Sequence, residues 1–179
     1  LRKFSLFRIK LDKILLIDLY NAIYRATSAF GRKPENVKPE ELIVYNFFRN
    51  LRPIIELFSP NQCILVSEGR PIHRYALFPE YKANRPSPNP LIKELYKYAI
   101  EMHQAIPADN CEAEDMVYRV SKEINHEGLI LFVDHDLLEI PSRFMNYKTG
   151  VFSKVLEKEA TYNLYKKLCL SEPGDNVKT

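Results

Sequence analysis

The chain of 179 residues has only five glycines, and these lie far apart. They stand at positions 31, 69, 128, 150 and 174, so neither a GxGxxG nor a GxxxxGK[ST] phosphate loop can be assembled from them. The sequence therefore argues against a dinucleotide-binding site and against a Walker-type nucleotide site.

Cysteine and long apolar runs are also scarce. The three cysteines form no CxxC pair, which argues against a disulfide framework and fits a reducing compartment. The longest apolar runs, such as 14–17 and 129–133, are far too short to cross a bilayer. We therefore expect a cytoplasmic protein without membrane contact.

A strong excess of one charge is missing as well. The 26 Lys and Arg residues nearly balance 23 Asp and Glu residues, which leaves a formal net charge of +3. With 46% hydrophobic and 27% charged residues, the composition is that of an ordinary globular protein. No linker, repeat or low-complexity tract divides the chain, and residues 1–179 are predicted to form a single domain.

Short apolar runs alternate with segments of helical periodicity. Runs at 14–17, 63–66 and 129–133 predict buried parallel strands, and helices are expected at 39–58, 91–102, 112–125 and 157–170. Segments 144–147 and 151–155 resemble an edge hairpin. This order predicts an α/β fold with a central, mostly parallel sheet flanked by helices.

Carboxylates follow each of the predicted strands. Asp18 and Glu68 come after the first two, and Asp134 and Asp136 come after the third. In open α/β sheets, ligands collect at the carboxyl ends of the strands. These side chains are therefore candidates for one functional site.

Two further acidic groups lie elsewhere in the chain. Glu112, Glu114 and Asp115 begin a predicted helix, and Glu172 and Asp175 flank a Pro-Gly pair. Taken alone, the first group is more typical of an acidic turn that complements a helix dipole, and the second of an ordinary surface turn.

Converging carboxylates repel one another unless cations neutralise them. Carboxylate oxygens without a His or Cys framework favour Mg²⁺ or Mn²⁺ over zinc. Two such ions about 4 Å apart are a recurring device for phosphodiester hydrolysis. The acidic residues therefore suggest a nuclease.

A basic and aromatic segment, residues 69–85, follows Glu68. It has the composition of a loop, and its Arg and Lys side chains suit a phosphate backbone while its tyrosines suit a stacked base. The open alternative is a solvated loop whose aromatic residues anchor it to the core. The candidate nucleic-acid contacts in it are Arg70, Arg74, Tyr81, Lys82 and Arg85.

Several short motifs occur in a fixed order along the chain. They are Leu15-Leu16-Ile17-Asp18, Glu68-Gly69-Arg70, Tyr81-Lys82-Ala83-Asn84-Arg85, Glu112-Ala113-Glu114-Asp115, Asp134-His135-Asp136 and Gly174-Asp175. Together they resemble the 5′ nucleases, a family of flap endonucleases and 5′→3′ exonucleases that includes phage enzymes and the N-terminal nuclease domain of bacterial DNA polymerase I. The resemblance covers nearly the whole chain and implies a PIN-like 5′-nuclease fold.

The resemblance assigns roles to individual positions. It implies that Lys82 and Arg85 contact the scissile phosphate, that Arg25 contacts DNA, and that residues 86–111 form a short arch. The acidic residues fall into a first-metal group, directly or through water, and a second-metal group. The first comprises Asp18, Glu68, Glu112, Glu114 and Asp115, and the second comprises Asp134, Asp136, Glu172 and Asp175.

The sequence departs from the family pattern in two respects. Glu68, Glu114 and Glu172 stand where Asp is usual, and the helix-hairpin-helix region that grips duplex DNA is expected to be missing. These departures keep a non-catalytic nucleic-acid-binding scaffold open as an alternative. A PIN-like ribonuclease, which would share the acidic α/β site, is another, although the segment from Arg70 to Arg85 argues against it.

The function that the sequence favours is a monomeric 5′→3′ exonuclease or flap endonuclease. It is expected to use two Mg²⁺ or Mn²⁺ ions and to act on DNA with 5′ ends or flaps, and on RNA primers in RNA–DNA hybrids. Its setting would be replication or repair in a bacterial or phage-infected cell.

Overall fold

The fold was analysed in a computed structural model of the chain. It describes residues 14–28, 38–87, 89–103, 105–132, 135–146 and 149–170. Among these residues, no helix is both long enough and apolar enough to span a membrane.

Five strands form one sheet in the order β2-β1-β3-β4-β5. They are β1 (Ile14–Asp18), β2 (Gln62–Val66), β3 (Leu129–Phe132), β4 (Ser142–Asn146) and β5 (Phe152–Val155). The first four run parallel to their neighbours, and β5 pairs antiparallel with β4 at one edge. The predicted parallel strands and the edge hairpin are confirmed.

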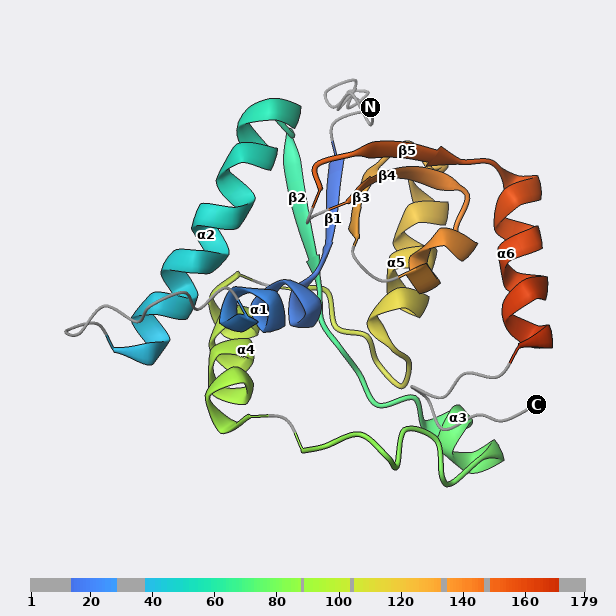
Figure 1. The fold of residues 1–179 in the computed structure, drawn as a ribbon, viewed down its shortest axis with the longest axis horizontal. Coiled ribbons are helices and arrows are strands. Elements are labelled where there is room, and N and C mark those ends of the chain that lie inside the picture. Colours follow the sequence, from blue (N-terminus) through green and yellow to red (C-terminus); the bar gives the residue numbers. More distant parts are fainter. Residues whose placement is uncertain are drawn as a thin grey trace, which may run out of the picture.

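Helices cover both faces of this sheet (Figure 1). They are α1 (Leu19–Ser28), α2 (Pro39–Phe58), α3 (Ile72–Leu77), α4 (Pro90–His103), α5 (Ala113–Glu123), the 3-10 helix η2 (His135–Glu139) and α6 (Glu157–Cys169). Figure 1 shows α2 on one side of the sheet and α5 and α6 on the other.

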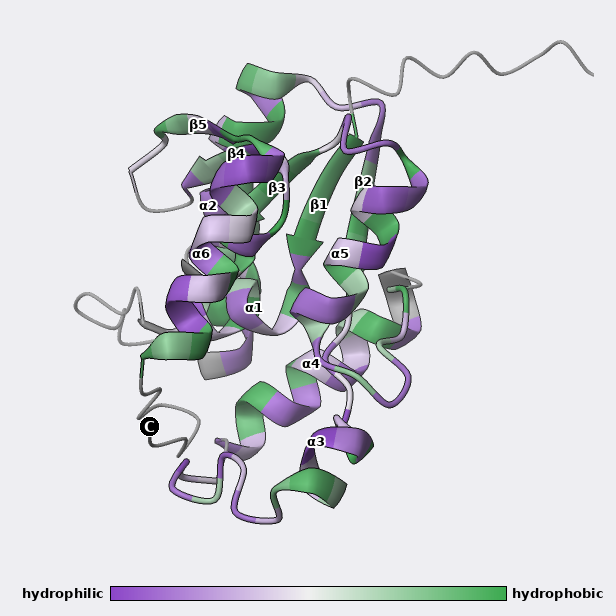
Figure 2. Ribbon diagram, turned by 90° about the vertical axis from the view of Figure 1, so that its right-hand side faces the viewer, coloured by the Kyte–Doolittle hydropathy of each residue, from purple (hydrophilic) through white to green (hydrophobic). Residues whose placement is uncertain are grey.

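The continuous apolar run of β1 is explained by these two layers. Successive side chains of a strand point to opposite faces. Leu15 and Ile17 pack toward α2 in one core cluster, whereas Ile14 and Leu16 pack toward α5 in another. All four are at most 3% exposed, and Figure 2 shows the strand as apolar along its length.

The four predicted long helices are confirmed with small shifts of their ends, and two further α-helices, besides the 3-10 helix η2, were not expected. The first, α1, follows β1 directly and packs against α2 and α4. The second, α3, lies inside residues 69–85, so the expectation of a loop throughout that segment is wrong. Six residues are too few for a recognisable helical period, which is why the sequence pattern missed it.

The segment expected to form an arch, residues 86–111, contains α4. Ile92 is buried against α1, and Leu91 and Leu95 pack around the same cluster. Much of this segment is therefore part of the packed body of the protein in this conformation, and its role as an arch stays a prediction.

Candidate active site

Two of the predicted carboxylates lie at the ends of neighbouring parallel strands. Asp18 is the last residue of β1 and is paired in register with Val66, and Glu68 follows two residues later. Asp18 also accepts a 2.9 Å hydrogen bond from the backbone N–H of Asn21, which caps the first turn of α1. Its backbone position is thus fixed by the strand and its side chain by the helix.

The acidic turn at the start of α5 lies beside these strand ends. Glu112 precedes the helix and forms a capping box with Asp115, whose carboxylate accepts a 3.1 Å hydrogen bond from the Glu112 N–H. The N–H of Ala113 lies 3.4 Å from Oε2 of Glu68. The structural and the functional interpretation of this turn are therefore compatible, because the turn caps α5 and also reaches the second strand end.

Glu112 is the best buried of these carboxylates, with a side chain that is 2% exposed. Its Oε2 accepts hydrogen bonds from Arg74 and, at 2.8 Å, from the hydroxyl of Tyr81. Its Oε1 is paired with the amino group of Lys82. Both carboxylate oxygens are thus bound to residues of the basic segment.

Arg74 spans the acidic turn from its position on α3. Its guanidinium group pairs with Glu112, lies 2.7 Å from Asp115 and lies 4.0 Å from Glu114. A planar guanidinium group suits this arrangement because its donors point in fixed, divergent directions. The candidate DNA contact Arg74 is therefore engaged with the carboxylates in this structure.

Electrostatics connect the strand ends with the acidic turn. Burial raises the pKa of Glu68 to about 7 from its ordinary 4.5, and the negative charges of Asp18 and Glu114 add to the shift. Lys82 acts in the opposite direction. The carboxylates of β1, β2 and α5 thus repel one another at close range, which is the electrostatic condition of a cluster that attracts cations.

Gly69 lets the chain pass close beneath the segment that leads into α5. A Cβ atom at this position would lie 1.6 Å from the carbonyl oxygen of Ala108 and 2.5 Å from that of Cys111. Only glycine fits so close to backbone. The glycine next to Glu68 in the sequence is the signal that could have indicated this constraint.

The remaining candidate nucleic-acid contacts lie around the cluster. Arg25 on α1 donates a 3.1 Å hydrogen bond to Asn21, and exposed Arg70 lies over the ring of Tyr75 at 5.3 Å. Arg85 is exposed at the end of the basic segment. Their contacts with nucleic acid stay predictions.

Tyr81 and Lys82 are more enclosed than exposed contact residues would be. Tyr81 is 8% exposed and lies edge-on to Tyr75, with ring centroids 5.8 Å apart. Lys82 has a left-handed backbone with φ of 55°, a conformation that costs a side-chain-bearing residue about 1 kcal/mol. A base could stack on Tyr81 only if the ring of Tyr81 became accessible. The ring of the half-buried Tyr75 is more accessible than that of Tyr81.

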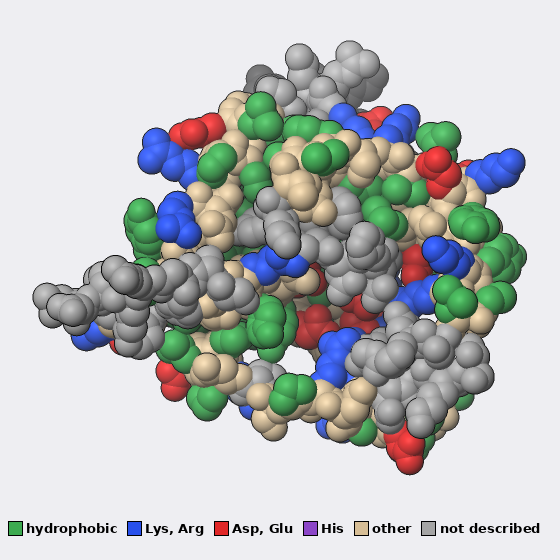
Figure 3. Space-filling model, in the orientation of Figure 1, with side chains coloured by type: hydrophobic (Ala, Val, Ile, Leu, Met, Phe, Trp, Pro, Cys, Tyr) green, Lys and Arg blue, Asp and Glu red, His purple; other side chains and the backbone are tan. Residues whose placement is uncertain are grey.

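The side chains of four predicted metal ligands lie outside the described part of the chain. Asp134, Glu172 and Asp175 lie outside the described residues, and of Asp136 only the backbone is described, within η2 after β3. Within the described part of the chain, no three Asp, Glu, His or Cys side chains are placed to hold a metal ion as they stand. Figure 3 shows acidic side chains beside Lys and Arg side chains in a hollow of the surface.

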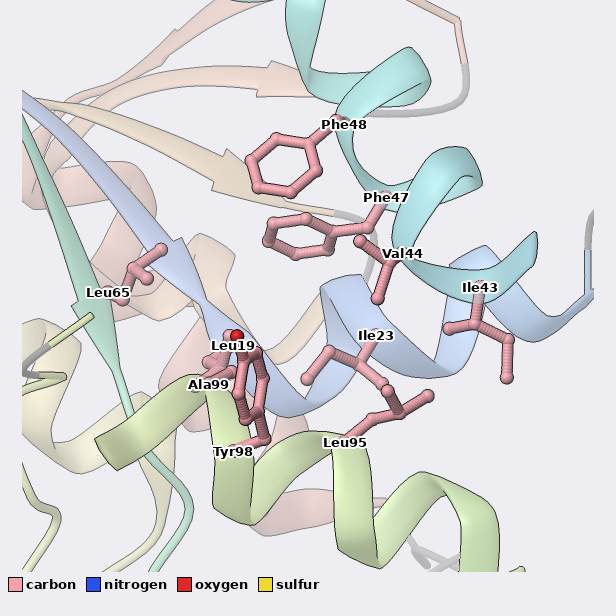
Figure 4. Close-up of a pocket in the computed structure, with 10 residues that line it drawn as sticks. All are labelled: Leu19, Ile23, Ile43, Val44, Phe47, Phe48, Leu65, Leu95, Tyr98 and Ala99. Carbon is pink, nitrogen blue, oxygen red and sulfur yellow. The ribbon is translucent and has the colours of Figure 1, made fainter. Parts of the chain in front are cut away.

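A separate pocket lies between α1, α2 and α4 (Figure 4). Its lining is apolar and includes Leu19, Phe47 and Tyr98. None of its lining residues is a carboxylate or a basic residue.

The family described as 5′–3′ exonuclease, N-terminal resolvase-like domain, matches residues 13–166. The chain belongs to this family of 5′ nucleases. The family assignment and the α/β fold expected from the ordered motifs are thereby confirmed, and the chain is a nuclease domain of the 5′–3′ exonuclease type.

Two DNA polymerases I are related in sequence. That of Treponema pallidum (strain Nichols) is 29% identical over 140 residues, which cover 71% of this chain and 14% of that protein. That of Bacillus caldotenax is 27% identical over 139 residues, or 73% of this chain and 16% of that protein. The chain thus spans about a seventh of the length of these relatives.

Solved structures share the fold at low sequence identity. The bacteriophage T5 D15 flap endonuclease, in a complex with DNA and metal ions, has a TM-score of 0.69 and 16% identity over 91% of this chain and 68% of its own. The catalytic core of Rad2 with DNA substrate has a TM-score of 0.52 and 16% identity over 88% of this chain and 52% of its own. At these identities the likeness is one of fold.

Two residues near the site were missed as functional candidates. In the sequence, Gly69 stands only as part of a motif, and Tyr96, which lies on α4, belongs to none of the motifs. The hydroxyl of Tyr96 is hydrogen-bonded to the backbone of Glu68. No sequence signal marks this contact, because 28 residues separate the partners.

Proposed function

We propose that this nuclease domain cleaves phosphodiester bonds near the 5′ ends of DNA with the help of divalent cations. The observation that supports this most directly is the position of Glu68, whose carboxylate is buried close enough to Asp18 and Glu114 for their negative charges to add to the burial that raises its pKa. A cation bound among Asp18, Glu68 and Glu114 would relieve that repulsion. The donor chemistry, all carboxylate oxygen, suits Mg²⁺ or Mn²⁺.

The first cation would be held by Asp18, Glu68 and Glu114, with Glu112 and Asp115 acting through water or by orienting the turn. Asp134, Asp136, Glu172 and Asp175 are proposed for a second ion on the resemblance to the family. When bound, such a pair of ions supplies a water molecule of lowered pKa and neutralises charge on the departing oxygen. The carboxylates hold the ions and are not themselves attacked.

Lys82 and Arg85 are proposed to neutralise the charge that grows on the scissile phosphate. Lys82 is suited to this because it is bound to Glu112 and its charge also acts on Glu68. Arg25, Arg70, Arg74 and Tyr81 are proposed to contact the nucleic acid around the cleaved bond. For Arg74 this requires an exchange of partners, since its guanidinium group is bound to the acidic turn.

DNA is the proposed substrate because the T5 and Rad2 structures that share the fold contain it. Three 5′-labelled substrates test the proposal, namely a flap, a nicked duplex and an RNA–DNA hybrid, each incubated with and without Mg²⁺. Wild-type protein is expected to cleave the first two only when Mg²⁺ is present. Cleavage of the hybrid would extend the substrate range to RNA primers.

Asp18→Asn is the informative variant for this assay. Asparagine is as good a helix cap as aspartate, so the bond to the Asn21 N–H and the start of α1 are retained while the charge is lost. Turnover is expected to fall at least 100-fold. Glu123→Gln, an exposed residue at the far end of α5, is the matched control and should retain full activity. Equal turnover of Asp18→Asn and wild type would refute the assignment.

A non-catalytic DNA-binding scaffold is the second candidate. It is favoured by the engagement of both Glu112 oxygens with Arg74 and Lys82, which places two positive charges where an ion would otherwise approach this carboxylate. Calorimetric titration with Mn²⁺ separates the two candidates. Binding of metal ions together with Mg²⁺-dependent cleavage supports the nuclease, and DNA binding without either supports the scaffold.

A further inference from the structure

The hydroxyl group of Tyr96 binds the backbone of Glu68 at both of its polar groups. It donates a 3.0 Å hydrogen bond to the Glu68 carbonyl oxygen and accepts one from the Glu68 N–H. A tyrosine hydroxyl is protonated at neutral pH, so it can donate one hydrogen bond and accept another at the same time. A side chain of α4 thus binds the backbone N–H and carbonyl groups that a neighbouring strand would bind in a sheet.

Glu68 needs such a partner because it lies beyond the end of β2. The last ladder contact of this strand is with Ile106, whose N–H donates to Leu65 and whose carbonyl accepts from Ser67. One residue further on, the Glu68 backbone has left the ladder. The Tyr96 hydroxyl extends the ordered backbone of β2 to the residue that carries the carboxylate.

The next residue is constrained from the other side. Gly69 passes so close to the carbonyl oxygens of Ala108 and Cys111 that it admits no side chain. Glu68 is therefore held between Tyr96 on α4 and the segment leading into α5. With its backbone held on both sides, its carboxylate is directed toward the N–H of Ala113 at the start of α5.

Tyr96 also contacts the segment that follows the other strand-end carboxylate. Its ring lies edge-on to that of Tyr20, with centroids 5.5 Å apart and planes at 80°. Tyr20 is the second residue of α1 and stands two residues after Asp18. One side chain of α4 therefore contacts the chain at both strand ends.

We propose that Tyr96 is a positioning residue that fixes the backbone from which the Glu68 carboxylate reaches a divalent cation shared with Asp18. The proposal rests on the proposed function, since it takes these two carboxylates to be cation ligands. An octahedral Mg²⁺ site tolerates small displacements poorly, and loss of a residue that orients a ligand commonly weakens metal binding 10- to 100-fold. Tyr96 touches neither the cation nor the nucleic acid and acts through the backbone of Glu68.

Tyr96→Phe tests the proposal because it removes the hydroxyl and leaves the ring against Tyr20. Tyr98→Phe is the matched control, as this tyrosine lies on the same helix with its side chain 54% exposed. Circular dichroism first establishes that both variants are folded at the temperature of the titration. Calorimetric Mn²⁺ binding is then expected to be about 10-fold weaker in Tyr96→Phe and unchanged in Tyr98→Phe.

A double-mutant cycle distinguishes positioning of Glu68 from a general loosening of the site. In a Glu68→Gln background, Tyr96→Phe should cause no further loss of Mn²⁺ affinity, because the group it positions is already gone. In an Asp18→Asn background the further loss should persist. In cleavage assays, kcat should fall while KM for DNA stays within twofold, since no DNA contact is removed.

Equal Mn²⁺ affinity in Tyr96→Phe and wild type would overturn the proposal and leave the nuclease function intact. An equal further loss in both backgrounds would also overturn it, because Tyr96 would then act on the fold and not on Glu68. If the wild type binds Mn²⁺ without cleaving DNA, the proposed function fails while the affinities still decide the role of Tyr96. If the wild type binds no Mn²⁺, both proposals fail.

Discussion

The ion pairs of Glu112 should contribute strongly to stability, and Glu112→Gln measures that contribution. Glutamine has nearly the same shape and keeps an oxygen for the α5 cap, so the substitution removes mainly the charge. The two cations that lose their counter-charge are poorly solvated, with side chains that are 14% exposed for Lys82 and 29% for Arg74.

Removing one partner of a buried ion pair costs about 3–5 kcal/mol. Because Arg74 remains paired with Asp115 and both cations keep some contact with water, we expect the lower end, about 3 kcal/mol. Urea unfolding followed by circular dichroism, in EDTA at pH 7.5, measures the free energy of unfolding directly.

An exposed ion pair on α2 serves as the control, because its geometry is as good as that of the buried pairs. Arg52 and Glu56 are one helical turn apart on α2 with 2.7 Å between nitrogen and oxygen, but their side chains are 79% and 63% exposed. Glu56→Gln should therefore leave the free energy of unfolding nearly unchanged. If Glu112→Gln is no more destabilising than Glu56→Gln, burial does not decide the strength of these pairs and the reasoning is wrong.

Three further predictions concern the neighbouring residues. In DNA-binding titrations, Lys82→Ala should reduce the magnitude of the slope of log binding constant against log salt concentration by about 0.9, whereas the exposed control Lys122→Ala should leave the slope unchanged. An unchanged slope in Lys82→Ala would remove Lys82 from the phosphate contacts. Gly69→Ala should lower the free energy of unfolding in urea by at least about 3 kcal/mol, because its Cβ atom would lie 1.6 Å from a backbone oxygen. Gly150→Ala should lower it by only about 1 kcal/mol, because that glycine has a φ of 69° but no atom near the added Cβ. Because the folded state raises the pKa of Glu68 from 4.5 to about 7, its ionised form destabilises the metal-free fold increasingly as the pH rises through that range. Glu68→Gln should therefore raise the melting temperature at pH 8 in EDTA, with a gain of at most about 3 kcal/mol in the free energy of unfolding, and leave it unchanged at pH 4. A lower melting temperature at pH 8 would contradict this sign.

Much of the fold could be predicted from local pattern alone. The run Ile14–Ile17 is apolar at every position because both faces of β1 are covered, and this pattern distinguishes a central parallel strand from an edge strand. The longer helices were predictable for a similar reason, since their 11 to 20 residues repeat the helical period often enough to be recognised. Helix α3, with six residues, is too short for its period to be recognised.

For the candidate site too, some features follow from local pattern in the sequence and others only from the folded structure. Asp18 and Glu68 could be assigned to one edge of the sheet from sequence, because parallel strands end on the same side. The state of each side chain could not. Glu112 is as acidic in sequence as Glu114, yet one is nearly fully buried and bound by two cations while the other is partly exposed.

By itself, the sequence determined the fold class, the family and the set of acidic and basic residues from which a site can be built. Each of these depends on residue types and on spacing along the chain, which can be read without coordinates. Only the tertiary structure decided that Arg74 and Lys82 bind Glu112, that Gly69 passes against backbone and that Tyr96 holds Glu68. These contacts join residues far apart in the chain, and their strength depends on burial, which is a property of the packed molecule as a whole.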